Sequence, residues 1–297
     1  MTSDPTTATA PEAPFGDRLR AAMDALGPFC PGIDPHRALV ESWGLSYDLA
    51  GVERFALTCV EAFGGQVAAV KPQSAFFEVF GSRGVALVER VLDELRSAGT
   101  LTVLDAKRGD IGTTMDAYAE AFLGTDATCP PDAMTVSPYL GYGSLRPAVE
   151  LAQRTGRGVF VLALTSNPEG PAVQHAVRDG RSVAGHVVDG VAADNAEAAA
   201  TGRLGSIGMV VGATVGTAVS DLGLDLSASA APLLVPGLGA QGGTAAGLRA
   251  TFGSALSQVL GTSSREVLGA GPDVGALRAA ARRHADELAT ALDTAAP

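Results

Sequence analysis

The stretch Thr102–Thr114 reads Thr-Val-Leu-Asp-Ala-Lys-Arg-Gly-Asp-Ile-Gly-Thr-Thr, and it decides how the rest of the chain is interpreted. A short apolar run ends at Asp105, and charged residues follow it at once. Apolar runs without polar alternation are typical of parallel strands that are buried on both faces. Charge placed directly after such a strand indicates the carboxyl edge of a parallel sheet, where α/β proteins carry their active sites.

Short apolar runs of this kind recur along the chain, and most segments between them are long enough for a helix. The segment Arg83–Ala98, for example, has an apolar stripe at helical spacing, and Gly99 is a natural helix stop. Eight strands alternating with helices predict an α/β fold and favour a (β/α)8 TIM barrel, with an open doubly wound sheet as the alternative. The candidate strands are Phe29–Asp34, Val67–Lys71, Thr100–Asp105, Ala133–Val136, Gly158–Leu164, Ile207–Gly212, Pro232–Val235 and Ser257–Leu260.

The domain organisation follows from the lack of any internal repeat or dividing linker. Residues 15–297 are predicted to form a single barrel domain, and residues 1–14, rich in Thr, Ala and Pro, a disordered tail. The Ala-rich segment Val191–Thr201 is expected to be plain helix, and Val215–Ala231 a helix and a loop.

Composition limits the partners and the compartment. The 297 residues carry a net charge of −11, which argues against nucleic acid as a partner because phosphate backbones need clustered Lys and Arg. Cys30, Cys59 and Cys129 are far apart with no CxxC spacing, so we expect a reducing compartment and no disulfide framework or zinc site. The start has neither the basic residues nor the apolar run of a signal peptide, and no stretch approaches the roughly 20 apolar residues of a membrane span. A cytoplasmic protein without a membrane partner is predicted.

Polar and glycine residues stand at the ends of the candidate strands. Alone, each has an ordinary structural explanation: an Asp before Pro is usually a turn, and a Lys after a strand is usually solvated. In a barrel, however, all these ends face one mouth, so their number indicates a shared site. They are Asp34, Lys71, Asp105, Ser166, Asn167, Gly212, and the segments Pro236–Gly243 and Gly261–Arg265.

The charged residues of the opening stretch suggest specific chemistry. Asp105 and Lys107 are two residues apart, so in an extended strand end both side chains would project to the same side. Asp110 lies beyond Gly109, and flanking carboxylates favour the ammonium form of Lys107. Alternating fixed charges can bind a metal or stabilise negative charge that develops in a transition state. A surface ladder of salt bridges, worth little energy, is the structural alternative.

Two glycine-containing segments predict a phosphate site. Pro236–Gly243 follows the seventh candidate strand and Gly261–Arg265 the eighth. Backbone N–H groups of glycine loops bind phosphate, and loops after strands seven and eight are a frequent phosphate site in barrels. The guanidinium of Arg265 would add a bidentate positive charge.

Taken together, these residues resemble those of the orotidine 5′-phosphate decarboxylases. Asp105-x-Lys107-x-x-Asp110-Ile111 resembles the family signature, and the likeness runs in order from about Phe15 to Leu268. The Lys-Arg-Gly-Asp-Ile-Gly and Thr-Ser-Asn-Pro forms are similar to the longer bacterial branch, type 2. The other matching segments are Gly32–Pro35, Lys71-Pro72, Thr165–Pro168, Val211–Thr214 and Pro236–Gly243.

The resemblance implies decarboxylation of orotidine 5′-phosphate to uridine 5′-phosphate, in de novo pyrimidine biosynthesis, by a homodimer without metal or organic cofactor. Lys107 is the implied proton donor to C6 of the pyrimidine, and Asp105 would face the substrate carboxylate. The resemblance also implies that Lys71 and Asp34 bind the ribose hydroxyls and orient Lys107, and that Ser166 contacts the pyrimidine. Asp110, Ile111 and Thr114 would reach into the partner subunit's site. Pro236, Gln241 and Arg265 would line the pyrimidine and phosphate ends of the substrate. In shorter family members the arginine directly follows glycine, whereas Arg265 follows Ser263-Ser264. The segment Ser137–Gly143 receives no role.

Two other functions fit parts of the pattern. A related barrel of the hexulose- or gulonate-phosphate type would use the acidic residues as magnesium ligands. A non-catalytic phosphate-binding barrel would not need the alternating charges of Lys71, Asp105, Lys107 and Asp110.

Overall fold

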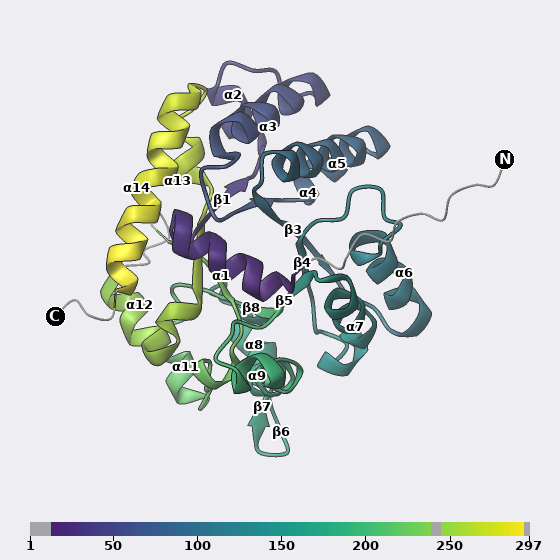
Figure 1. Cartoon of the computed structure of the whole chain (residues 1–297), viewed down its shortest axis with the longest axis vertical. Helices are drawn as coiled ribbons and strands as arrows, with labels where there is room; N and C mark the ends of the chain where they lie inside the picture. The colour runs from purple at the N-terminus through teal and green to yellow at the C-terminus, as the bar shows by residue number, and fades with distance from the viewer. Residues whose placement is uncertain (1–12, 239–244, 294–297) are drawn as a thin grey trace.

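The computed structural model describes residues 13–238 and 245–293 and has at its centre a closed barrel of eight parallel strands (Figure 1). Around the barrel the strands follow the order β1-β10-β9-β8-β5-β4-β3-β2, and each pairs in parallel with its neighbours. The strands are β1 Phe29–Ile33, β2 Ala69–Pro72, β3 Leu101–Arg108, β4 Ala133–Val136, β5 Gly158–Leu164, β8 Ile207–Val211, β9 Leu233–Pro236 and β10 Val259–Ser263.

Helices surround the strands and cover their outer faces (Figure 1). The longer ones are α1 Phe15–Leu26, α3 Leu49–Phe63, α5 Ser82–Ser97, α6 Gly112–Leu123, α7 Arg146–Thr155, α9 Val183–Asp194, α12 Ala245–Phe252 and α14 Val274–Leu292. The shorter ones are α2 Arg37–Ser42, α4 Ala75–Glu78, α8 Gly170–Gln174, α10 Ala196–Ala200, α11 Ala218–Asp221, α13 Arg265–Leu268, and the 3-10 turns η1 Tyr142–Leu145, η2 Ser227–Ser229 and η3 Gly253–Gln258.

The barrel confirms the predicted fold class and excludes the open doubly wound sheet, because β1 pairs with β10 as well as with β2. All eight predicted strands exist. The bounds of β4 and β5 match the prediction, whereas those of the other six strands differ at one or both ends. The eighth was predicted as Ser257–Leu260, whereas β10 begins two residues later and extends to Ser263. Ser257 lies in the turn η3, and pairing of Phe29 with Gly261 holds the glycine inside the strand. The residues Gly261–Ser263 therefore belong to a strand and not to a following loop.

The predicted helices needed smaller corrections. Helix α5 lies one residue earlier than the predicted Arg83–Ala98. Val191–Thr201 is not one helix, because α9 ends at Asp194 and α10 begins at Ala196. The break is at Asn195, whose buried amide donates to the carbonyls of Ile207 and Ser229 and accepts the N–H of Ile207. Those bonds satisfy buried backbone groups that a continuing helix would leave unpaired.

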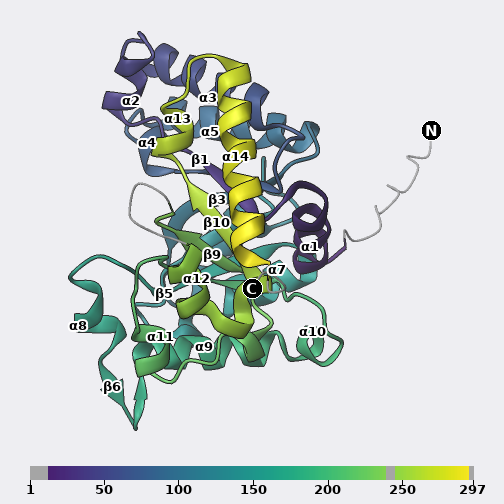
Figure 2. The same ribbon diagram turned by 90° about the vertical axis from the view of Figure 1, so that its left-hand side faces the viewer.

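Helix α1, which the strand analysis did not include, covers the amino end of the barrel (Figures 1 and 2). Its buried face, Phe15, Leu19 and Met23, packs in one apolar cluster with residues of the barrel interior. Phe15 meets Phe160 of β5 edge to face, with ring centroids 5.9 Å apart. Gly158 must lack a side chain here, since a Cβ would lie 2.3 Å from the Phe15 ring. The predicted tail before α1 falls mostly in residues 1–12, outside the described part.

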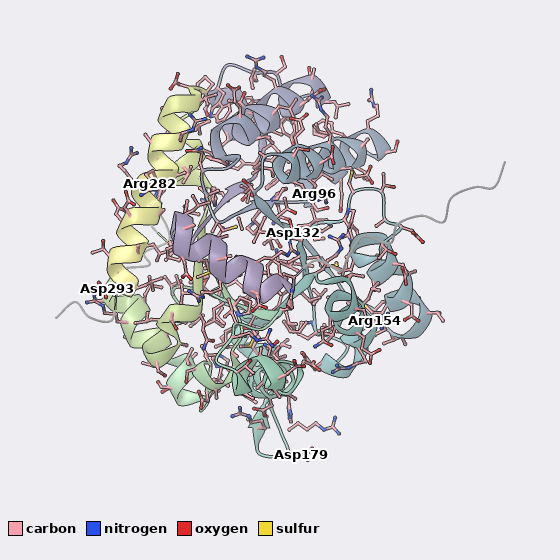
Figure 3. The ribbon with its side chains drawn as sticks, viewed as in Figure 1. Arg96, Asp132, Arg154, Asp179, Arg282 and Asp293 are labelled. Atoms are coloured by element: carbon pink, nitrogen blue, oxygen red, sulfur yellow. The ribbon has the colours of Figure 1, made fainter. Side chains whose placement is uncertain are left out.

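A small antiparallel hairpin also escaped the sequence analysis. Strands β6 Val177–Arg178 and β7 Arg181–Ser182 are joined through Asp179 and Gly180, which both have positive φ. An Asp-Gly pair favours the tight turn that fits the twist of a two-stranded ribbon. Figure 3 shows Asp179 at the tip, projecting away from the barrel.

Within residues 13–238 and 245–293, no helix is long and apolar enough to cross a membrane. The three cysteines are free thiols, and those of Cys30 and Cys59 are buried.

The closure of the barrel by α1 depends on one buried carboxylate. Asp132, which precedes β4 and lies beside α1 (Figure 3), accepts hydrogen bonds from the Thr102 backbone and hydroxyl at 2.9 and 3.0 Å. It also pairs with Arg18 of α1 at 2.5 Å. We expect Asp132→Ala to lower the free energy of unfolding by about 2–4 kcal/mol in urea titrations, because it leaves buried donors without an acceptor. The control is Asp24→Ala in α1, because the exposed ion pair of Asp24 with Arg20 should contribute almost nothing to stability. Equal losses in the two variants would contradict this account.

Candidate active site

A cavity of about 570 Å³ opens at the carboxyl ends of the barrel strands. Its volume is within the range of roughly 300–1,000 Å³ that small-molecule sites occupy. The inner part is apolar, because Leu162, Val210 and Leu234 of the barrel interior line it. The outer part is polar and includes six of the predicted site residues: Asp34, Lys71, Asp105, Lys107, Pro236 and Arg265.

Asp105 is the centre of the polar part, and both of its carboxylate oxygens are occupied by donors. Oδ1 lies 2.5 Å from Lys107 Nζ and accepts the Thr135 hydroxyl at 2.9 Å. Oδ2 lies 3.0 Å from Lys71 Nζ and accepts the Gln73 amide at 2.8 Å. One carboxylate therefore brings two ammonium groups to the same point of the cavity.

The two lysines differ in burial, and this determines how accessible each one is to a ligand. The Lys71 side chain is 8% exposed, whereas that of Lys107 is 44% exposed. Burial alone would lower the pKa of Lys71, but Asp34 and Asp105 outweigh it and hold the pKa above its ordinary value. Burial alone would raise the pKa of Asp105, but Lys71 and Lys107 hold it well below its usual range. Lys71 and Asp105 are therefore both charged near neutral pH, and of the two lysines Lys107 is the more accessible to a ligand.

Lys107 reaches Asp105 by a route other than the predicted one. An extended strand end was predicted here, but Lys107 has φ of +47°, in the left-handed region. Leu104 pairs with Met134 and Arg108 with Val136, so three residues of β3 oppose the single residue Thr135 of β4. This β-bulge, not regular alternation, turns the Lys107 side chain toward Asp105. A non-glycine residue in this conformation costs on the order of 1 kcal/mol and persists only where its surroundings impose it.

The wall formed by β1 and β10 offers polar groups for a ligand. Asp34 Oδ1 lies 3.9 Å from Lys71 Nζ, and among the described residues it has no hydrogen-bond partner. The same holds for the buried Thr262 hydroxyl, within that part of the chain. Gly32 allows the two strands to approach, because a Cβ there would lie 2.0 Å from Ser264 Oγ. Arg265, at the start of α13, is exposed at the rim of the cavity.

Four predicted site residues do not line the cavity. Asp110 is half-buried and accepts the N–H of Ile111 at 2.8 Å, while Ile111 and Thr114 are exposed at the start of α6. Ser166 is exposed after β5, although its neighbour Thr165 lines the cavity. The fifth residue, Gln241, lies outside the described residues.

Four lining residues were not predicted from the sequence: His36, Gln73, Phe76 and Thr135. Ser263 and Ser264, in the predicted phosphate segment Gly261–Arg265, also line the cavity. Gln73 had a detectable signal, because it is a polar residue two positions after Lys71. Thr135 had none, since it stands inside the apolar run Ala133–Val136. His36 caps α2 by accepting the Leu39 N–H on Nδ1, and it also lines the cavity.

The cavity is a poor match for a divalent cation. No group of three His, Cys, Asp or Glu side chains suited to a metal occurs in the described ranges. Each of the two carboxylates in the cavity already faces the Lys71 ammonium, which would repel a cation.

Comparison with known proteins identifies the family. The model of the "Orotidine 5'-phosphate decarboxylase / HUMPS family" matches residues 27–280. This chain belongs to that family. Among curated relatives, the orotidine 5′-phosphate decarboxylase of Streptomyces coelicolor is 60% identical over 281 residues, covering 94% of this chain and 98% of the relative. That of Salinispora tropica is 59% identical over 270 residues, covering 91% and 95%.

Solved structures of family members have the same barrel. A crystal structure from Streptomyces avermitilis superposes with a TM-score of 0.91 at 57% identity, covering 97% of this chain and 99% of that one. The OMP decarboxylase of Leishmania donovani gives a TM-score of 0.72 at 29% identity, covering 95% and 100%.

The charge balance of this family member's cavity can be tested through stability. We expect Lys71→Met to lower the free energy of unfolding by about 3 kcal/mol at pH 7, because it leaves two carboxylates without their buried cation. Lys107→Met is the matched control. It removes a charge from the same carboxylate, but at an exposed position, and should cost much less.

The deficit of Lys71→Met should also depend on pH. The folded pKa of Asp105 lies below its unfolded value, so its stabilisation is present above about pH 4 and is lost as the pH falls. Without Lys71 that pKa is less depressed, so the variant has less stability to lose on acidification. Urea titrations at pH 7 and near pH 3, below the unfolded pKa of an aspartate, should show the gap to wild type narrowing at the lower pH. A gap that widens would refute the charge assignment.

Proposed function

We propose that this chain decarboxylates orotidine 5′-phosphate to uridine 5′-phosphate in de novo pyrimidine biosynthesis. The curated relatives that match nearly all of the chain carry that activity in their names. The observation that supports it most directly is the pair of lysines on Asp105, one fixed and buried and the other accessible to a ligand. Such preplaced positive charge is what a reaction that develops negative charge on carbon requires.

The accessible lysine, Lys107, is proposed to act on C6 of the pyrimidine. Breaking the bond between C6 and the carboxyl carbon leaves an electron pair on C6, with little resonance to relieve it. An ammonium held beside C6 stabilises that pair and then transfers a proton to it, which gives uridine 5′-phosphate and carbon dioxide. The contact with Asp105 holds the Nζ of Lys107 in place for this step.

Asp105 is proposed to lie against the substrate carboxylate. Two carboxylates at close range repel each other, and the repulsion ends when carbon dioxide leaves. Because Lys71 and Lys107 hold Asp105 ionised, binding of the substrate cannot be eased by protonation of this residue. The energy for this approach comes from contacts with remote parts of the substrate, above all its phosphate.

The remaining contacts are assigned by position in the cavity and by family resemblance. Asp34 and Lys71 are proposed to bind the ribose hydroxyls, which suits the open acceptor of Asp34. Arg265, at the rim beside β10, is proposed to bind the phosphate. Pro236, Gln241 and Ser166 are proposed to contact the pyrimidine and the phosphate end.

The reaction is proposed to need no metal or organic cofactor. The alternative, a magnesium-dependent sugar-phosphate barrel, would use the same carboxylates as ligands. The Lys71 ammonium between Asp34 and Asp105 favours the cofactor-free reaction, because it already supplies the positive charge that a metal would bring.

We further propose a cytoplasmic homodimer in which each subunit completes the other's site. Ile111 is 62% exposed and Tyr139 78%, and both follow neighbouring strands at the mouth of the barrel. Large apolar side chains exposed together are typical of an interface. Asp110, Ile111 and Thr114 would then reach the neighbouring cavity. The free thiols agree with a reducing compartment.

The activity can be tested by following the absorbance of orotidine 5′-phosphate with purified protein in excess chelator. We expect full turnover in chelator, because the lysines supply the positive charge. The folded variant Lys107→Ala should lose at least roughly 10³-fold in kcat. Activity that disappears in chelator and returns with magnesium would favour the magnesium barrel, and normal turnover by Lys107→Ala would exclude the assigned proton donor.

The shared site can be tested by mixing inactive Lys107→Ala and Asp110→Ala subunits. In a heterodimer one site then carries both defects and the other carries neither. With random exchange about half the dimers are hetero, so about a quarter of wild-type activity should return. If exchange is demonstrated by mass spectrometry and the mixture stays inactive, Asp110 serves its own subunit.

A further inference from the structure

Thr135 of β4 lies directly opposite the β-bulge of β3 and is 1% exposed at the inner wall of the cavity. We propose that its hydroxyl is the positioning group of the site, fixing at once the side chain of Asp105 and the backbone of Lys107. The proposal rests on the decarboxylation proposed above. It adds a residue that would touch neither the reacting atoms nor the proton in transfer.

The hydroxyl makes three contacts with three consecutive residues of β3. It accepts the N–H of Ala106 at 3.1 Å and the N–H of Lys107 at 3.0 Å. It donates to Asp105 Oδ1 at 2.9 Å. A hydroxyl has two lone pairs and one proton, so these contacts use all of its hydrogen-bonding capacity. The direction of the O–H bond is therefore determined: with both lone pairs occupied, the proton points to Asp105.

These contacts replace the bonds that the bulge removes from the strand pairing. Regular pairing stops at Leu104 and resumes at Arg108, so the N–H groups of Ala106 and Lys107 face β4 where it has only one residue. A side-chain acceptor at that position satisfies both groups. It also stabilises Lys107 in the left-handed conformation that directs its ammonium to Asp105.

One hydroxyl thus sets the relative position of the two charged groups assigned to the chemistry. An aliphatic side chain of the same shape would fill the space equally well. It would leave two N–H groups without an acceptor and Oδ1 of Asp105 with one donor fewer. We therefore expect packing to survive the loss of the hydroxyl while the alignment of Lys107 with Asp105 does not.

The test compares Thr135→Val, which keeps the shape, with Thr135→Ser, which keeps the hydroxyl. We expect Thr135→Val to reduce kcat roughly 10²-fold, the loss typical of a misplacement of about 1 Å. KM and the Kd for uridine 5′-phosphate should change much less, because the binding groups remain. Thr135→Ser should retain kcat within about threefold of wild type. Turnover by Thr135→Val at the wild-type rate, or an equal loss in Thr135→Ser, would overturn the proposal.

Two further measurements separate the possible causes of failure. If Thr135→Val does not fold or does not bind uridine 5′-phosphate, the test compares Thr135→Ser with Thr135→Ala, since these two variants differ only by the hydroxyl. Equal kcat values in these two variants would refute the positioning role. If the wild-type protein shows no turnover, the proposed function fails first. The crystal structure of Thr135→Val then decides the positioning role alone: Lys107 retaining positive φ and its contact with Asp105 would refute it.

Discussion

The carboxylate of Asp105 is the interaction on which the other charged residues of the cavity depend. An ammonium as deeply buried as that of Lys71 is stable only beside opposite charge, because burial otherwise drives it to lose its proton. The same carboxylate holds Lys107, and two neutral donors, Gln73 and Thr135, complete its coordination. The positive charge proposed to act in the reaction is thus held by a negative charge that the fold buries with it. Changes at any one of these residues alter the others.

A barrel of regular strands could not produce this arrangement by itself. In regular strands side chains alternate between the barrel interior and the helix layer, and successive inward residues are separated by a fixed spacing. The bulge in β3 interrupts that spacing at the carboxyl end, while the pairing of Leu104 with Met134 keeps the strand in register below it. The site therefore depends on a short irregular stretch of backbone at the end of an otherwise regular barrel strand. The strain at Lys107 is tolerated because β4 and the charges around Asp105 impose it.

Most of the fold and about half of the site could be predicted from the sequence, and there is a physical reason why the rest could not. Buried parallel strands are continuous apolar runs, so all eight were visible, and charges after such a run identified Asp105 and Lys107. Strand ends depend on pairing partners, which explains why β10 was placed two residues early and why Gly261 was taken for a loop residue. The role of Thr135 depends on the register between β3 and β4, which no local pattern specifies. The break at Asn195 likewise depends on carbonyls distant in sequence.

Helix α1 has a consequence for how molecules move through the protein. Its apolar face fills the amino end of the barrel, and the cluster that it joins includes Val210 and Leu234 from the inner part of the cavity. The apolar face of α1 thus packs at the end of the barrel opposite the mouth of the cavity. We expect a nucleotide and the solvent that it displaces to pass through the mouth at the carboxyl ends of the strands. Exchange of molecules between the cavity and solvent is therefore expected to be governed at the mouth and not at the amino end of the barrel.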